Sequence, residues 1–281
     1  MAGFFGLFNY EKEGPGISKN APKKKTFVVF FETFFRNFWK FVPLNCFYML
    51  LSMPLLTGGL ASVGLTHVAR NTARDKHSFG FSDYIDTIRK NWKQALPVGI
   101  LRVLAVALLV FAFIFYLQSE GWGATLGIGV CLCIAFVLVT MNFFIWTLIV
   151  TFKFSLKQLL KNSFHFVFLN IKMNLLCCFI LLLVNALFVS LPFLFFHPLL
   201  VTIEAMVYMG VYPAFEHLLV QYCTFPAIKK YIIDPYYEEH PDEDIERRRD
   251  LGLEVEDPNQ PETDEALAEG EEDPDAPVFE D

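Results

Sequence analysis

Four ionisable residues lie inside long apolar stretches of this chain and are the first candidates for a functional role. Arg102 is in the stretch 97–117, and Glu204, Glu216 and His217 are in the stretch 198–222. Charged side chains are costly inside a bilayer, where they usually face the bundle interior or a water-filled path. Arg102 and Glu216 lie at comparable depths in their stretches. A pair between them would either hold two helices together or form part of a path for a solute or proton.

Glu204 raises a separate question, because no basic residue lies at its depth. It follows His197 by about two helical turns. One interpretation is a water-filled vestibule shared with His197, in which a solute or proton binds. The other is an exposed or hydrogen-bonded glutamate near the outer surface.

Other polar and small residues in the apolar stretches predict helix packing. Intramembrane amides usually form hydrogen bonds between helices, and glycines four or five residues apart allow two helices to approach closely. The amides are Asn45, Asn142 and Asn185, and the glycine pairs are Gly59 with Gly64 and Gly123 with Gly127.

The chain has none of the motifs that carry well-known catalytic chemistry. It lacks a phosphate-binding loop, Gly-x-Ser-x-Gly, His-Glu-x-x-His and a dinucleotide-binding fingerprint. All six cysteines lie in apolar stretches, without the loop positions and spacing of zinc ligands or of a disulfide framework. We therefore expect reduced cysteines that pack in the interior, no metal or cofactor, and no enzymatic activity.

The elements that position these residues are predicted to be membrane helices. The chain is 54% hydrophobic and contains 32 phenylalanines, which is more large apolar surface than one soluble core of this size hides. Four stretches reach the ~20 residues needed to cross the hydrocarbon. A fifth runs over 41–56 and can extend back toward Phe27, and "TGGLASVGLTHVAR" (57–70) follows it. We expect an all-α, polytopic transmembrane helix bundle with about six membrane segments; five is the alternative.

The distribution of charge predicts the orientation. The connections 70–93 and 153–172 are rich in lysine and arginine, whereas the turns 118–123 and 197–198 have neither. The positive-inside rule places the basic connections and both termini in the cytoplasm, with the body in the plasma membrane. Five spans with an outer N-terminus remain the alternative, and the lysines at 23–25 count against it.

Three amphipathic segments are expected at the cytoplasmic surface of the bilayer, at 34–42, 87–95 and 160–167. Each combines a basic residue, an asparagine and aromatic residues, a pattern typical of helices that lie on anionic lipid. Because the clusters adjoin the membrane, they fit anionic lipid better than nucleic acid. The basic residues expected to face lipid are Arg36, Lys40, Lys90, Lys93, Lys153, Lys157 and Lys161.

The charge also divides the chain into regions. Residues 1–235 hold 20 Lys and Arg against 10 Asp and Glu, a net of +10, whereas residues 236–281 hold 3 against 20, a net of −17. The acidic end has no apolar periodicity with which to repay the entropy of folding. We expect a cytoplasmic leader (1–26), a transmembrane helical domain (27–235) and a disordered acidic tail (236–281).

The leader is the most specific part of the chain. "FFGLFNYEKEGPGISKNAPKKK", followed by "FFRNFWKFVPLN" and "SMPLLTGGLASVGLTHVAR", resembles the YesL-like family of bacterial membrane proteins, also catalogued as domain of unknown function 624. The resemblance covers residues 1–235. Such proteins are mainly found in Gram-positive bacteria and are often encoded beside carbohydrate ABC transporters. The resemblance implies a plasma-membrane protein with a link to sugar uptake, and it supplies no catalytic residues.

Three functions are therefore considered. The first is an accessory component of a carbohydrate ABC-type uptake system that binds its permease or ATPase. The second is a small-solute transporter or channel, with Arg102, Glu204 and Glu216 along its path. The third is a membrane-organising or lipid-sensing scaffold that works through its basic amphipathic helices.

Overall fold

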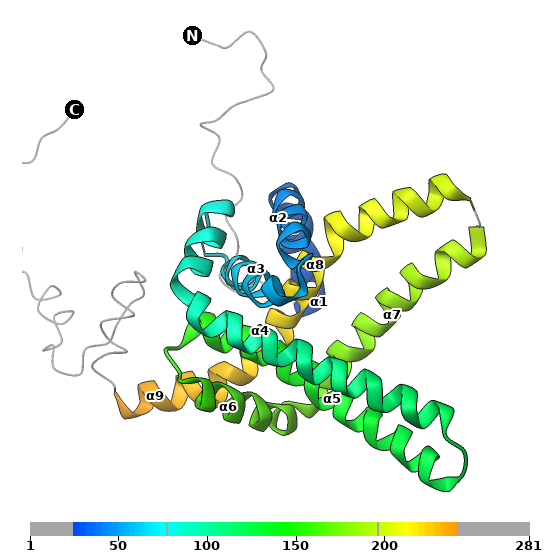
Figure 1. The fold of residues 1–281 in the computed structure, drawn as a ribbon. Coiled ribbons are helices and arrows are strands. Elements are labelled where there is room, and N and C mark those ends of the chain that lie inside the picture. Colours follow the sequence, from blue (N-terminus) through cyan, green and yellow to red (C-terminus); the bar gives the residue numbers. More distant parts are fainter. Residues whose placement is uncertain (1–24, 77, 196, 241–281) are drawn as a thin grey trace, which may run out of the picture. The chain divides into compact units, whose positions relative to one another are not determined.

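The computed structural model describes residues 25–76, 78–195 and 197–240, and the leader that the sequence singled out lies almost wholly outside them. Within the described residues the regular structure is helical, without strands, which confirms the all-α part of the predicted fold class (Figure 1). The elements are α1 (Thr26–Arg36), α2 (Phe38–Ser52), η1 (Leu55–Thr57), α3 (Gly58–Ala73), α4 (Phe81–Gln118), α5 (Trp122–Thr151), α6 (Leu156–Leu169), α7 (Ile171–Phe195), α8 (Pro198–Ile228), η2 (Lys229–Ile233) and α9 (Asp234–Glu239).

Four helical segments of the described chain are long and apolar enough to cross a membrane. They are Phe81–Gln118, Trp122–Thr151, Ile171–Pro192 and Pro198–Glu239. Much of their apolar surface faces outward: Leu108 is 70% exposed and Phe111 is 72% exposed. Exposing such side chains along whole helices would be unfavourable in water and is favourable in lipid. The helices fit a membrane protein.

The predicted count of about six membrane segments is not confirmed, because the elements before α4 are short. α2 has 15 residues and α3 has 16, or about 22–24 Å at 1.5 Å per residue, against a hydrocarbon core of about 30 Å. A turn at Asn37 separates α2 from α1, so the two do not form one continuous span. The predicted surface segment 34–42 therefore straddles this turn, whereas the segment 87–95 lies within the long helix α4.

Helices α3 and α4 approach each other closely. A Cβ atom added at Gly59 would lie 2.5 Å from the carbonyl oxygen of Ala95 and 2.9 Å from the Cα atom of Gly99. Further along α3, Gly64 lies against the ring of Tyr84, whose hydroxyl donates a 3.0 Å hydrogen bond to the carbonyl of Ala61. The predicted close approach at Gly59 and Gly64 is confirmed. α3 thus pairs with the part of α4 that largely precedes the apolar stretch 97–117.

The two glycines of the second predicted pair differ in how closely another helix approaches them. A Cβ added at Gly127 would lie 2.4 Å from the Tyr116 ring, so α5 does approach α4 closely there, whereas Gly123 has open space around it. Only one glycine of this pair is needed for packing.

Helix α8 is joined to other helices by polar contacts. Asn45 on α2 donates to the carbonyl of Gly210 (2.7 Å), and Gln221 donates to Thr147 on α5 (2.8 Å). Asn185 on α7 donates to the Tyr212 hydroxyl at 2.6 Å. With the contact of Asn142 described below, all three asparagines form the predicted interhelical hydrogen bonds.

Helix α6 is amphipathic and packs on α5. Ser155 and Gln158 form a capping box at its start, which satisfies otherwise unpaired N–H groups. Phe166 stacks on Phe144 of α5 with ring centroids 4.8 Å apart, and Leu159 is fully buried. The apolar face therefore rests partly on protein, whereas the sequence predicted a helix that lies on anionic lipid.

The chain divides into two units, one ending at Ala227 and one beginning at Ile228. In the second unit, the helix continues to Glu239, past the predicted start of the tail at residue 236. Asp234 and Pro235 open α9, and proline is well tolerated in the first turn of a helix. The remainder of the predicted tail, 241–281, lies outside the described residues.

Candidate functional site

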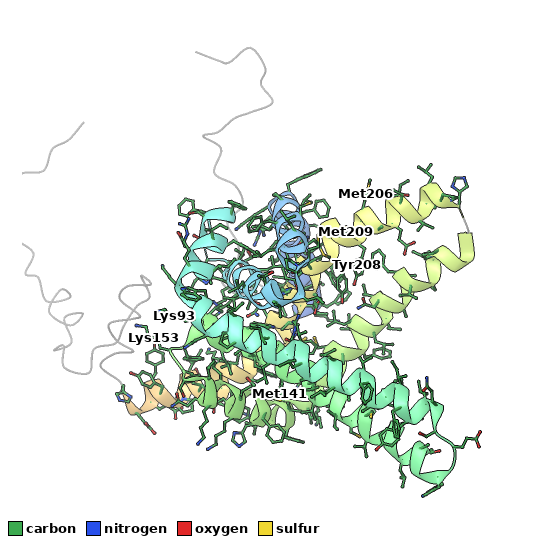
Figure 2. All side chains as sticks on the ribbon, viewed as in Figure 1. Lys93, Met141, Lys153, Met206, Tyr208 and Met209 are labelled. Atoms are coloured by element: carbon green, nitrogen blue, oxygen red, sulfur yellow. The ribbon has the colours of Figure 1, made fainter. Side chains whose placement is uncertain are left out.

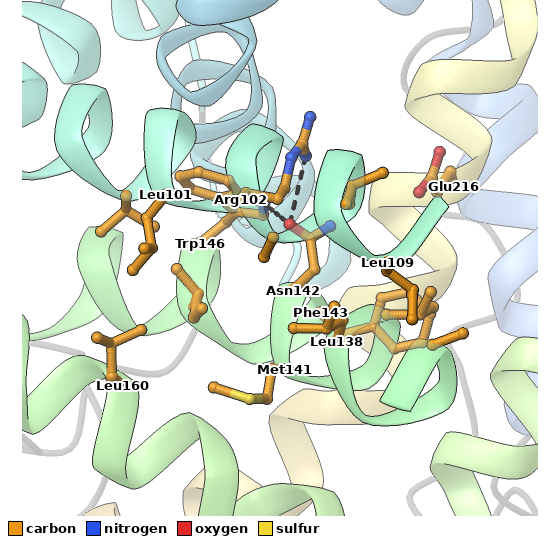
Figure 3. A pocket seen from close by; sticks show the side chains of 16 residues that line it. Leu101, Arg102, Leu109, Leu138, Met141, Asn142, Phe143, Trp146, Leu160 and Glu216 are labelled. Atoms are coloured by element: carbon orange, nitrogen blue, oxygen red, sulfur yellow. Dashed lines mark hydrogen bonds between the residues drawn. The ribbon is translucent and has the colours of Figure 1, made fainter. Parts of the chain in front are cut away.

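A polar cluster lies in the interior of the first unit, where α2, α3, α4, α5 and α8 meet. It surrounds a small cavity of about 30 Å³. Arg102, Asn142 and Trp146 also line a larger cavity beside it, of about 430 Å³, together with Glu216 (Figure 3). The residues lining the small cavity are Tyr48, Ser62, Thr66, Arg102, Asn142, Phe143, Trp146, Glu216, His217 and Val220.

Asn142 organises one side of the cluster. Its Oδ1 atom accepts a hydrogen bond from the Trp146 indole N–H at 2.8 Å and a second from Nη1 of Arg102 at 3.3 Å, both drawn in Figure 3. The Arg102 guanidinium lies over the Trp146 ring, 5.8 Å from its centroid. Because Asn142 and Trp146 are one turn apart on α5, a single helix face fixes the arginine from α4.

Helix α8 supplies the other side of the cluster. His217 is 8% exposed, and its Nδ1 donates to the carbonyl of Pro213 at 2.8 Å. The ring of Tyr48, on α2, packs edge-on against His217 with centroids 5.3 Å apart. Glu216 lines both cavities.

The structure brings together three of the four residues that the sequence selected. Arg102, Glu216 and His217 share the small cavity. Arg102 and Glu216 do not form an ion pair within 4.0 Å in the described part of the chain, unlike Arg36 with Asp75 and Arg89 with Asp86. The arginine is instead held by a neutral amide and an aromatic ring.

Glu204 lies apart from this cluster. It is partly exposed in the first half of α8 and lines neither of the two cavities. His197, its predicted neighbour in a vestibule, is exposed. The ionisable groups of α8 are thus divided between two places.

Sequence reasoning missed four polar members of the cluster: Tyr48, Ser62, Thr66 and Trp146. Trp146 carried one usable signal, its position one turn after Asn142. The other three come from α2 and α3, and only the folded structure shows that these helices pack against the α4–α5 pair. The polar cluster places hydrogen-bond donors and acceptors around the small cavity. Such a cluster is suited to binding a ligand.

A second group of polar residues ties the loops at one end of the first unit together. Arg36 pairs with Asp75, and Lys40 donates to the carbonyl of Ser78 at 2.8 Å. These contacts fix the α1–α2 turn to the α3–α4 connection. Burial lowers the pKa of Lys40, while the nearby Asp83 opposes this shift. Of these two residues expected to face lipid, Arg36 is exposed although it pairs with Asp75, and Lys40 is partly buried.

The other connections at this end are tied in the same way. Nη1 of Arg70, on α3, donates to the carbonyl of Val150 (2.7 Å) and to Thr151 (2.9 Å) at the end of α5. A cation at this place pairs with carbonyl groups that lack helical partners and with the negative end of the helix dipole. Gln94 donates to the carbonyl of Phe154 at 2.8 Å, which joins α4 to the α5–α6 connection.

The remaining five predicted basic residues are exposed and form what we call the basic face: Lys90, Lys93, Lys153, Lys157 and Lys161. Figure 2 shows Lys93 and Lys153 close together, as the hydrogen bond between Gln94 and Phe154 requires. Lys157 and Lys161 are one turn apart on α6. The basic face is thus carried by elements that are bonded to one another.

Residues 41–113 match a family model described as "Protein of unknown function, DUF624". The matched segment includes Tyr48, Ser62, Thr66 and Arg102 of the cluster. No curated protein and no solved structure matches the chain. Over residues 41–113, the match confirms the resemblance that the sequence indicated, to the YesL-like family and its domain of unknown function 624.

Proposed function

We propose that this protein is a non-enzymatic, multi-pass protein of the plasma membrane that acts as an accessory component of a carbohydrate ABC-type uptake system. Its termini and its basic face lie in the cytoplasm, and the basic face binds the permease or the ATPase of that system. The link to sugar uptake comes from the family resemblance.

One observation carries the docking role: the basic face is preformed. Hydrogen bonds from Arg70 and Gln94 join α3 and α4 to the end of α5 and to the α5–α6 connection, next to these lysines. A surface that is already ordered loses little conformational entropy when a partner binds, so that more of the contact energy appears as affinity. Exposed lysines add electrostatic steering toward an acidic partner surface.

The alternative of a transporter or channel has one supporting observation, the ionisable residues around the interior cavities. Against it, Glu204 does not line either of the two cavities that Arg102 and Glu216 share. The alternative of a membrane-organising scaffold is supported by the exposed lysines of α6, which would contact anionic lipid.

Affinity purification from particles that retain native lipid tests the proposal. We expect the wild-type protein to recover a permease or ATPase subunit, identified by mass spectrometry. A variant with Lys153, Lys157 and Lys161 changed to Glu should lose that subunit, whereas the matched change to Arg should keep it. Recovery of neither subunit by the wild-type protein contradicts the accessory role. Equal recovery by both variants contradicts docking through the basic face.

A further inference from the structure

A third cavity lies where the start of α1 and the end of α3 meet α8. Its volume is about 200 Å³, whereas a single water molecule needs about 10–15 Å³. The cavity belongs to the first unit, and none of the described residues that line it is acidic. We call it the arginine pocket, because its polar and aromatic lining consists of Arg70 and Arg74 with Thr26, Gln221, Tyr222 and Phe225.

Arg70 is fixed at this pocket, and its hydrogen-bonding capacity is only partly used. Its Nη1 atom donates to the carbonyl of Val150 and to Thr151, which holds the guanidinium in place. Its Nε atom is buried and has no hydrogen-bond partner among the residues that the structure describes. Burial also lowers the pKa of Arg70, because desolvation disfavours the charged form. A negative group in the pocket would compensate this buried charge.

Arg74 follows one turn later on α3 and is oriented by an aromatic ring. The central carbon of its guanidinium lies 3.6 Å from the centroid of the Phe225 ring, in a cation–π contact. A guanidinium has five N–H donors in a fixed fork, so Arg74 can bind an anion and keep its other contacts. Arg70 and Arg74 therefore bring two positive charges to one cavity.

The start of α1 adds to the positive potential of the pocket. Thr26 is the first residue of this 11-residue helix, and the preceding Lys25 provides no side-chain cap. The first N–H groups of a helix and its dipole favour an anion. The α8 wall is also fixed, because Gln221 is hydrogen-bonded to α5 and Tyr222 to α1. An anion would thus meet groups that are already in place.

We propose that the arginine pocket binds a phosphate group. A phosphate monoester carries about −1.5 to −2 charges at pH 7, which matches the two guanidinium groups, and its oxygens fit their fork of donors. Arg70 also contacts Val150 and Thr151, so the pocket lies beside the end of one of the four helices long enough to cross a membrane. At that level the phosphate comes from a lipid head or from a soluble phosphate ester.

Two binding measurements on the full chain distinguish these sources. In the first, glycerol phosphate is titrated into the protein in maltoside detergent without phospholipid, and binding is followed by calorimetry. In the second, the protein is released from nanodiscs that contain phosphatidic acid or diacylglycerol, and bound lipid is detected by native mass spectrometry. Binding of glycerol phosphate assigns the pocket to soluble esters, and retention of phosphatidic acid alone assigns it to lipid heads. Binding of neither overturns the proposal.

Matched variants locate the binding. Arg74→Gln should weaken the binding of either ligand about ten- to a hundredfold, because it removes a charged donor. Arg74→Lys keeps the charge without the fork and should bind with intermediate affinity. Arg89→Gln removes the same charge from a side chain that is 77% exposed and lies outside the pocket, and it should bind like the wild-type protein. Wild-type binding by both Arg74 variants, or equal weakening by Arg89→Gln, would overturn the site.

Competition tests the kind of anion. Inorganic phosphate should displace the ligand that binds, whereas acetate at the same ionic strength should displace it at least several-fold less, because acetate carries a single charge. Equal displacement by acetate and phosphate would overturn the assignment to a phosphate group. This competition uses the wild-type protein, so it tests the proposal even where an arginine variant fails to fold.

Discussion

The close contact between α3 and α4 predicts that Gly59→Ala destabilises the protein. The new Cβ would meet the carbonyl oxygen of Ala95 at 2.5 Å and the Cα atom of Gly99 at 2.9 Å, against 3.4 Å for an ordinary van der Waals contact. Both atoms belong to the backbone, so no side chain can rotate away. The two helices must separate by a substantial part of an ångström, which would also displace Gly58, the neighbour of the Arg102 guanidinium.

The size of the loss in unfolding free energy follows from a comparison of Gly59 with a matched glycine, Gly123. Gly123 is also the second residue of its helix, and nothing lies within 4 Å of a Cβ added there. Replacing glycine by alanine favours the helix by up to about 1 kcal/mol at either site. This gain is common to both variants. The difference between them is therefore the overpacking cost at Gly59, about 1–3 kcal/mol.

The assay is the free energy of unfolding of the two variants and the wild-type protein, measured by titration with sodium dodecyl sulfate in mixed micelles. We expect Gly123→Ala to equal or exceed the wild-type stability and Gly59→Ala to fall below Gly123→Ala by about 1–3 kcal/mol. Equal stability of the two variants would refute the close crossing of α3 and α4.

Three further predictions concern the ends of the helices. Arg70→Gln should destabilise the protein by about 1–3 kcal/mol, since it removes a charged donor from the carbonyl of Val150; no loss in the same titration would contradict the bond. Ser155→Ala should cost about 1 kcal/mol by removing the cap of α6, seen as faster hydrogen exchange in the first turn of α6 alone. Single cysteines at Ser155 and Glu120, in a cysteine-free background, should be labelled by an impermeant reagent from the cytoplasmic and the outer side, respectively; labelling of both from one side would contradict the orientation.

The helices that cross the membrane are predictable from sequence because long apolar runs and basic connections are local signals. Asn142 and Asn185 were also predictable as interhelical donors or acceptors, since an amide in lipid needs a partner. The count of segments was not, because the small residues of 57–70 suit a membrane hairpin and a helix packed beside α4 equally well. In the structure α3 has 16 residues and packs against α4 at Gly59 and Gly99, and the count of about six segments is not confirmed.

The candidate site was predictable in part. An intramembrane arginine and glutamate at similar depths pointed to Arg102 and Glu216, and both line the cavities. The sequence did not reveal that Asn142 would lie between Arg102 and Trp146, because that depends on how α4 and α5 are rotated against each other. Nor did it reveal the partners of Arg36 and Lys40, because Asp75 and Ser78 are more than 35 residues away in the sequence.

Site-specific photocrosslinking in cells tests the docking role most directly. A photoreactive residue at Lys157, on the exposed side of α6, is predicted to form a covalent adduct with the permease or ATPase of a sugar transporter, identified by mass spectrometry. The same residue at Ser119, in the connection between α4 and α5, should form no such adduct. Adducts with lipid alone at Lys157, or adducts with the transporter at Ser119 in place of Lys157, would contradict the account.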